Sequence, residues 1–180
     1  MSFSRRARII AASIGTSALL AATATVAVTA ASAAPAGATA AGCKSSAVQV
    51  WTGSPGDDAA GHSFWQVEIS NVSHHTCTLF GYPGVSELRN GHQVGKPAGH
   101  SGAKSTVTIP AGGTAHFVLT VTDAFIVCAH PVKGTDLKVF PPGQFKSQTA
   151  PFAALMCKGK VTLRVDAVHA GTGIPGHTTF

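Results

Sequence analysis

The chain has 180 residues, of which 11% are charged and 44% are hydrophobic, with a formal net charge of +6. This composition excludes acidic disordered chains, coiled coils and collagen-like repeats, which all need different residue frequencies. The length fits one domain, since a domain usually takes roughly 100–200 residues.

Residues 1–34 have the three parts of a secretory signal peptide. A positive start contains Arg5, Arg6 and Arg8, an uncharged stretch follows, and Ala31-Ser32-Ala33 offers the small residues that signal peptidase needs. A membrane anchor is the alternative, because about 20 apolar residues span a bilayer, but Ala and Thr dilute this stretch. We expect cleavage near residue 34, a secreted extracellular product, and no stable membrane anchor after cleavage.

Cleavage changes the charge of the chain. It would remove three of the 13 Lys and Arg, leaving 10 against 7 Asp and Glu and a net charge of +3. The remaining basic residues are dispersed along the sequence rather than clustered. Nucleic-acid binding requires a basic surface that neutralises several phosphates together, so we expect no nucleic-acid partner.

All four Cys lie beyond the leader, at positions 43, 77, 128 and 157. An even number in an exported chain predicts two disulfides, and the wide spacing argues against a structural zinc site. Three connectivities are open; we favour Cys43–Cys77 and Cys128–Cys157, which close the shortest loops. The weak lipoprotein pattern at Ala40-Ala41-Gly42-Cys43 leaves lipidation of Cys43 as an alternative.

Beyond an Ala/Gly/Pro linker at 35–42, the hydrophobic pattern has period two, which is typical of strands. It is clearest at 64–69 and at 115–121, while Asn90-Gly91 predicts a two-residue hairpin turn. Helical patterns are scarce, apart from one possible short turn at Phe152–Met156. We therefore predict an all-β fold, a single immunoglobulin-like β-sandwich over 43–170, with a flexible tail at 171–180. The expected strands are 48–51, 64–69, 76–80, 85–89, 106–109, 115–121, 137–140 and 161–166.

Residues 71–85, which read N-V-S-H-H-T-C-T-L-F-G-Y-P-G-V, carry a family resemblance. With Asn90-Gly91, Pro110–Gly113 and the last two Cys, they resemble the domain-of-unknown-function family 4232 of exported and lipid-anchored actinobacterial proteins. The resemblance covers roughly residues 43–168. It implies an extracellular β-sandwich with two disulfides, and it implies no activity and no catalytic residues.

The turn at Gly81-Tyr82-Pro83-Gly84 stands out within this run. The glycines permit positive φ and Pro83 stiffens the chain between two strands. Tyr82 is then either packed against the domain or exposed as a contact residue.

Motifs that carry chemistry are missing from the sequence. There is no G-x-S-x-G, no H-E-x-x-H and no phosphate-binding loop, and the seven acidic residues fit solvated turns and strand faces. We predict no enzyme activity and no cofactor. Of the nine His, His74 and His75 are weak candidates for a copper or zinc site, and solvated loop residues are the simpler interpretation.

These observations predict a secreted, non-enzymatic binding module at or outside the cell envelope, whose partner is an extracellular protein or a cell-wall component. One alternative is a small protease inhibitor that uses residues 154–158 as its exposed loop. Another is a hydrolase of wall polymers.

Overall fold

The computed structural model describes residues 40–173, so the predicted signal peptide and residues 174–180 lie outside the description. The chain divides into two units, Met1–Gly37 and Ala38–Phe180, and everything described belongs to the second. No helix within residues 40–173 is long and apolar enough to cross a membrane.

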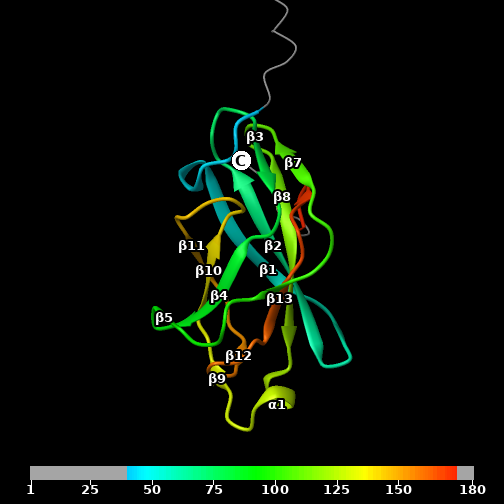
Figure 1. The fold of residues 1–180 in the computed structure, drawn as a ribbon, viewed down its shortest axis with the longest axis vertical. Helices are drawn as coiled ribbons and strands as arrows, with labels where there is room; N and C mark the ends of the chain where they lie inside the picture. Colours follow the sequence, from blue (N-terminus) through cyan, green and yellow to red (C-terminus); the bar gives the residue numbers. More distant parts are fainter. Residues whose placement is uncertain (1–39, 174–180) are drawn as a thin grey trace, which may run out of the picture. The chain divides into compact units, whose positions relative to one another are not determined.

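The larger of two facing sheets has the order β1-β2-β8-β13-β6, and β14 also pairs with β8 (Figure 1). Neighbouring strands are antiparallel except for the parallel pair β13 and β6. The strands span β1 (Val48–Ala59), β2 (His62–Asn71), β6 (Gly99–His100), β8 (Thr114–Thr122), β13 (Leu163–Val165) and β14 (His169–Ala170).

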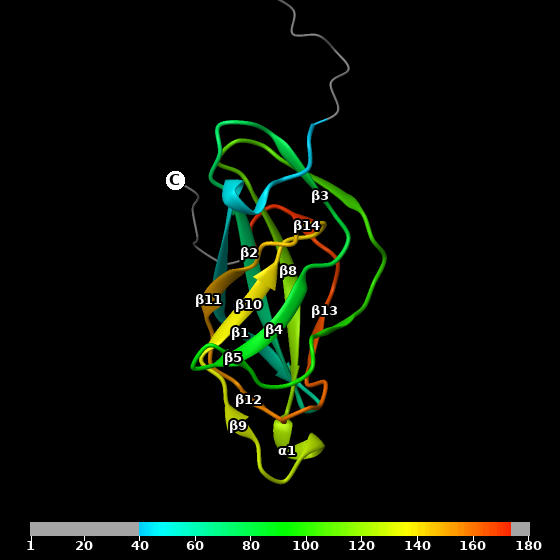
Figure 2. The ribbon, with the colours of Figure 1, turned by 60° about the vertical axis from the view of Figure 1, so that its left-hand side comes forward.

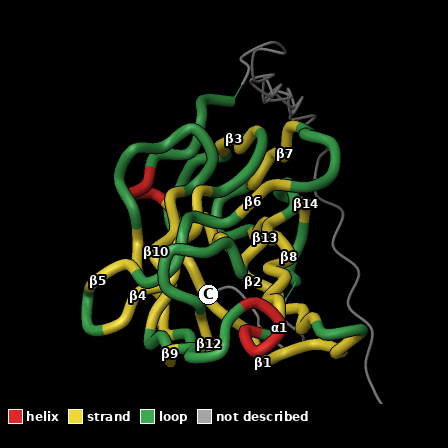
Figure 3. Tube along the Cα trace, turned by 60° about the horizontal axis from the view of Figure 1, so that its bottom comes forward, coloured by secondary structure: helices red, strands yellow, loops and turns green. Residues whose placement is uncertain are grey.

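The second sheet has the order β11-β10-β4-β5 and lies across the first, which gives two layers (Figure 2). Two further ribbons, β3-β7 and β12-β9, flank these layers. The bounds are β3 (Cys77–Phe80), β4 (Gly84–Arg89), β5 (His92–Gln93), β7 (Thr106–Ile109), β9 (Val132–Lys133), β10 (Asp136–Phe140), β11 (Gln148–Pro151) and β12 (Leu155–Met156). The described helical segments are η1 (Ser45–Ala47) and α1 (Ala124–Val127), red in Figure 3.

The core between the layers confirms the period-two prediction. In β8, alternate residues from Ala115 to Val121 are buried, and Phe117 and Leu119 have no exposed surface. The opposite layer contributes Leu137 and Val139, which are also fully buried. Burying each such side chain stabilises the fold by about 1.5–3 kcal/mol. The all-β sandwich with two disulfides is therefore confirmed.

The favoured cysteine pairing is also confirmed. Cys43 is bonded to Cys77, and Cys128 to Cys157, so none of the described cysteines is free. The first disulfide fastens the start of the domain, where Gly42 forms a parallel bridge with Thr78. The second joins the end of α1 to the residue after β12. Disulfides persist in oxidising compartments, so the pairing indicates a non-cytoplasmic environment.

Two predictions of secondary structure are wrong. Residues 152–156 form no helical turn: the Phe152 amide donates to Thr135 and the Ala154 amide to Glu87, so tertiary partners take these donors. The strand expected at 161–166 is shorter, because β13 spans only Leu163–Val165. A turn precedes it, in which the Lys160 amide donates to the Cys157 carbonyl, and Val161 is 51% exposed.

The prediction that every acidic side chain is solvated is wrong as well. Glu68 and Glu87 are at most 1% exposed. Asp58 is exposed and lies in β1, which continues to Ala59 through two register shifts around Pro55. β1 is at the edge of its sheet, where a proline is tolerated because a missing N–H on the outer side of the strand leaves no neighbouring strand without a donor.

Candidate functional site

The Gly81–Gly84 turn fastens three segments of the domain together. Gly81 has a φ of +98°, and its carbonyl accepts from the Val168 amide. Half-buried Tyr82 stacks on His100 with ring centroids 4.6 Å apart, and its hydroxyl donates to the Gly102 carbonyl. Because these contacts engage both the ring and the hydroxyl of Tyr82, we interpret the turn as a structural fastener rather than a free binding surface.

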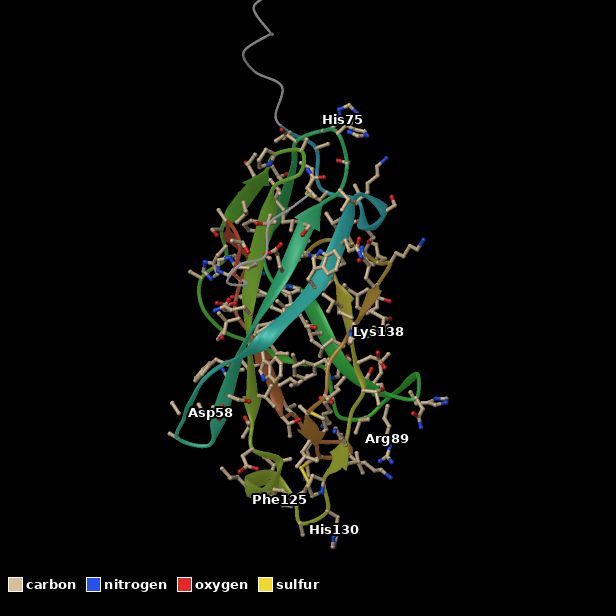
Figure 4. All side chains as sticks on the ribbon, turned by 180° about the vertical axis from the view of Figure 1, so that it is seen from behind. Asp58, His75, Arg89, Phe125, His130 and Lys138 are labelled. Carbon is tan, nitrogen blue, oxygen red and sulfur yellow. A yellow bond between two sulfur atoms is a disulfide. The ribbon has the colours of Figure 1, made fainter. Side chains whose placement is uncertain are left out.

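The turn that carries His74 and His75 is organised by Asn71. The Asn71 side chain is 1% exposed and donates to the carbonyls of His75, Ile109 and Pro110. Both histidines are exposed, and Figure 4 shows His75 at the end of the domain opposite Phe125. Within the described part of the chain, no group of three His, Cys, Asp or Glu could hold a metal ion.

A cavity of about 460 Å³ lies at the end of the domain that carries α1. We call it the helix pocket. Its lining comes from the tip of the β1–β2 hairpin (58–63), the end of β8 and start of α1 (121–124), the segment 153–155, and Trp65. Trp65 follows the hairpin tip within β2, so the lining comes from three separate parts of the sequence that the fold brings together.

The rim of the helix pocket is apolar and exposed. Phe125 and Ile126, which follow the lining residue Ala124, are 65% and 68% exposed, and the lining residue Leu155 is 39% exposed. A Cβ at Gly61 would come within 2.5 Å of Ile126 Cδ1, so Ile126 lies directly over the hairpin tip. Large exposed apolar side chains that gather in one place indicate a contact site.

Two features hold this rim in place. Asp123 accepts a hydrogen bond from the Phe125 amide at 2.9 Å and so caps the four-residue α1. At the other end of α1, Cys128 is bonded to fully buried Cys157. The apolar side chains are therefore presented on a segment that is anchored at both ends.

A second cavity, of about 360 Å³, lies on the other side of the β9–β12 ribbon. We call it the basic groove. Arg89, His92 and Lys158 line it, together with Gln93, Val94, Val132 and Gly159. No acidic residue is among its lining residues. Leu155 of the ribbon thus faces the helix pocket, while Val132 of the paired strand faces the basic groove.

Glu87 lies at the junction of the two cavities. Its carboxylate accepts from the amide of Ala154, which lines the helix pocket, and its main-chain carbonyl accepts from the amide of Val94, which lines the basic groove. A Cβ at Gly134 would come within 1.6 Å of Glu87 Oε1, so only glycine fits there. Desolvation by burial raises the pKa of Glu87 from 4.5 to about 8, although main-chain amides act in the opposite direction.

The model of the family described as Domain of unknown function (DUF4232) matches residues 43–169. The chain belongs to this family. No curated protein and no solved structure matches it significantly. The family description assigns no function, so the site of this DUF4232 domain follows from its geometry alone.

Sequence reasoning missed most of that site. It singled out the Gly81–Gly84 turn and the His pair, and the cavities of the DUF4232 domain lie elsewhere. Two of the sequence predictions lie at this end: the Cys128–Cys157 disulfide, and the segment 154–158, which contributes Ala154 and Leu155 to the helix pocket and Lys158 to the basic groove. The segment 154–158, considered as an inhibitory loop, forms β12 with Met156 and Cys157 fully buried, so its accessible side chains are those at its margins.

Proposed function

We propose that this DUF4232 protein is an exported, non-enzymatic binding protein that contacts its partner through the helix pocket. The observation that carries the proposal is the exposure of Phe125 and Ile126, 65% and 68%, beside a cavity of about 460 Å³. Leaving a large apolar side chain in water forgoes about 1.5–3 kcal/mol of burial free energy. A partner that covers the rim recovers part of it.

The anchoring of the rim favours binding. Because α1 is capped by Asp123 and tied by the Cys128–Cys157 disulfide, little conformational entropy is lost when a partner docks. Asp58 and Asp123 line the pocket, and no Lys or Arg does. We therefore expect a partner that presents an apolar group beside a cationic one, as an extracellular protein or an amine-bearing wall component does.

Hydrolysis fits this pocket less well. A glycosidase needs two free carboxyl groups, one on each side of the scissile bond. The pocket has two acidic residues, Asp58 and Asp123, and the side chain of Asp123 is engaged with the Phe125 amide as a helix cap. This arrangement supports a binding role over a catalytic one.

The test compares two double variants of the full chain, each tagged and exported with its own leader. Phe125→Ser with Ile126→Ser removes the rim, and Val72→Ser with Phe145→Ser is the matched control, because those side chains are 55% and 98% exposed and lie outside the pocket. We expect wild type and control to retain the same component of culture supernatant or wall fractions, and the rim variant to retain at least tenfold less.

Equal retention by the rim variant, or no retained component at all, would refute the proposal. A panel of extracellular proteases and wall polymers, assayed with the same three proteins, tests the inhibitor and hydrolase alternatives. Inhibition or turnover that survives loss of the rim would point to one of those alternatives instead.

A further inference from the structure

We propose that the basic groove is a phosphate-binding site that takes a phosphate monoester or phosphodiester group. The inference concerns a different cavity from the helix pocket and does not depend on the proposed function. It rests on the convergence of Arg89, His92 and Lys158 on a groove of about 360 Å³.

Two of the three side chains are fixed by the β4–β5 hairpin. Arg89 and His92 are directly opposite each other across the ladder, so both side chains are on the same face with Cβ atoms about 4.5–5.5 Å apart. The turn between them, Asn90-Gly91, has φ values of 51° and 79°, the left-handed pair that a tight hairpin turn needs. The spacing of these two side chains is therefore set by the backbone.

Lys158 reaches the groove from a separate segment. It follows Cys157, whose disulfide anchors it to α1, and it lies in a turn closed by the Lys160 amide donating to the Cys157 carbonyl. Gly159 has a φ of +67° in that turn and also lines the groove. Lys158 is thus held at the groove by covalent and hydrogen-bonded anchors.

No acidic side chain is among the described residues that line the basic groove. Glu87 shares a face of β4 with Arg89, because residues two apart in a strand point to the same side. The Glu87 side chain is nevertheless buried and hydrogen-bonded to the Ala154 amide. Neither Arg89 nor Lys158 forms a salt bridge with any residue in the described range 40–173. Like charges placed together repel one another, and an anion in the groove relieves that repulsion.

The chemistry of the lining selects among anions. An Arg guanidinium forms paired hydrogen bonds to phosphate oxygens, and a nearby Lys adds a point charge. The groove also has the apolar side chains of Val94 and Val132 in its wall. An organic substituent can pack there, which favours a phosphate ester over free inorganic phosphate.

The experiment follows amide NMR shifts and the melting temperature of the exported full chain at constant ionic strength. The probes are inorganic phosphate, glycerol 3-phosphate, a poly(glycerol phosphate) polymer, and glycerol as the neutral control. Arg89→Gln with Lys158→Gln empties the groove of charge. Lys138→Gln with Arg164→Gln is the matched control, since it removes one Lys and one Arg outside the groove; Figure 4 shows Lys138 and Arg89 at separate places.

We expect saturable shifts for residues 89–94 and 157–160, tighter binding of glycerol 3-phosphate than of inorganic phosphate, and a melting temperature that rises with ligand. The groove variant should bind at least tenfold more weakly, and the control variant within about twofold of wild type. Tighter binding of the polymer than of the free ester would identify a polymeric source, and equal binding a small ester. Absence of saturable shifts, or equal weakening in both variants, would overturn the proposal.

Discussion

Glu87 shows how one buried side chain sets the chemistry between the two cavities. Its Oε2 is buried and has no hydrogen-bond partner in the described structure, while its Oε1 faces Gly134 and accepts from the Ala154 amide. A buried carboxylate that lacks hydrogen-bond donors for both oxygens is energetically costly, so the protonated form is favoured there. Raising the pKa of Glu87 to about 8 keeps the side chain neutral near pH 7.

This pKa predicts how stability depends on pH. In the unfolded chain Glu87 ionises near pH 4.5, whereas in the folded protein it keeps its proton until about pH 8. The unfolded state therefore binds fewer protons across this window, and the free energy of unfolding falls as pH rises from about 4.5 to 8. Glu87→Gln removes the ionisation, so the free energy of unfolding of the variant should not fall in this way. Between pH 5 and pH 8, the stability of the variant relative to wild type should increase by on the order of 2–4 kcal/mol.

Urea denaturation of both proteins at pH 5, 6.5 and 8 measures this difference. Asp58→Asn is the control, because it replaces a carboxyl by the matching amide at an exposed position rather than a buried one. Parallel pH profiles for wild type and Glu87→Gln would show that Glu87 is ionised in the folded protein.

Among the elements, those with a strong local signal were predictable from the sequence and the others were not. The alternation of hydrophobic residues predicted β8, and Asn90-Gly91 predicted the turn between β4 and β5. The four residues of α1 are too few to show a helical period, and the two-residue strands β9 and β12 exist because each supplies the other with a partner. The helix pocket combines such elements, so its lining has no contiguous sequence signal.

The β2–β3 turn shows a similar dependence on distant partners. Asn71 Nδ2 donates to the carbonyls of His75, Ile109 and Pro110, and thereby ties this turn to the end of β7. Nothing in the sequence around Asn71 indicates that this side chain is buried. Its polar atoms are compensated by carbonyls that belong to another turn.

We expect Asn71→Ala to lower the free energy of unfolding by about 2–4 kcal/mol, because it leaves buried carbonyls without their donor. Ser73→Ala, in the same turn but half-exposed, should cost less than about 1 kcal/mol. Chemical denaturation of the two variants provides the comparison. Similar losses for both would show that the turn, and not the buried amide, supplies the stability.

At the scale of the whole described domain, the two disulfides lie at opposite ends. Cys43–Cys77 joins the start of the domain to β3, whereas Cys128–Cys157 joins the end of α1 to the residue after β12. Figures 1 and 2 show β3 and α1 at opposite ends of the ribbon. Their sequence separations, 34 and 29 residues, are nearly equal. In the chain-entropy model each therefore contributes about 3.5–4 kcal/mol, by constraining the unfolded chain.

Because the two disulfides contribute similar free energies but lie at different ends of the domain, removing each in turn separates an effect on stability from an effect on the geometry of the cavities. We expect the double Ala variants of the two pairs to lose similar amounts of stability, and reduction of wild type to lower its melting temperature by at least as much as either. Only loss of Cys128–Cys157 should increase amide hydrogen exchange across 124–134 and 153–160, because these segments have few other anchors. If both variants increased exchange in these segments equally, the second disulfide would stabilise the whole domain and would have no specific role in holding the segments that form the two cavities.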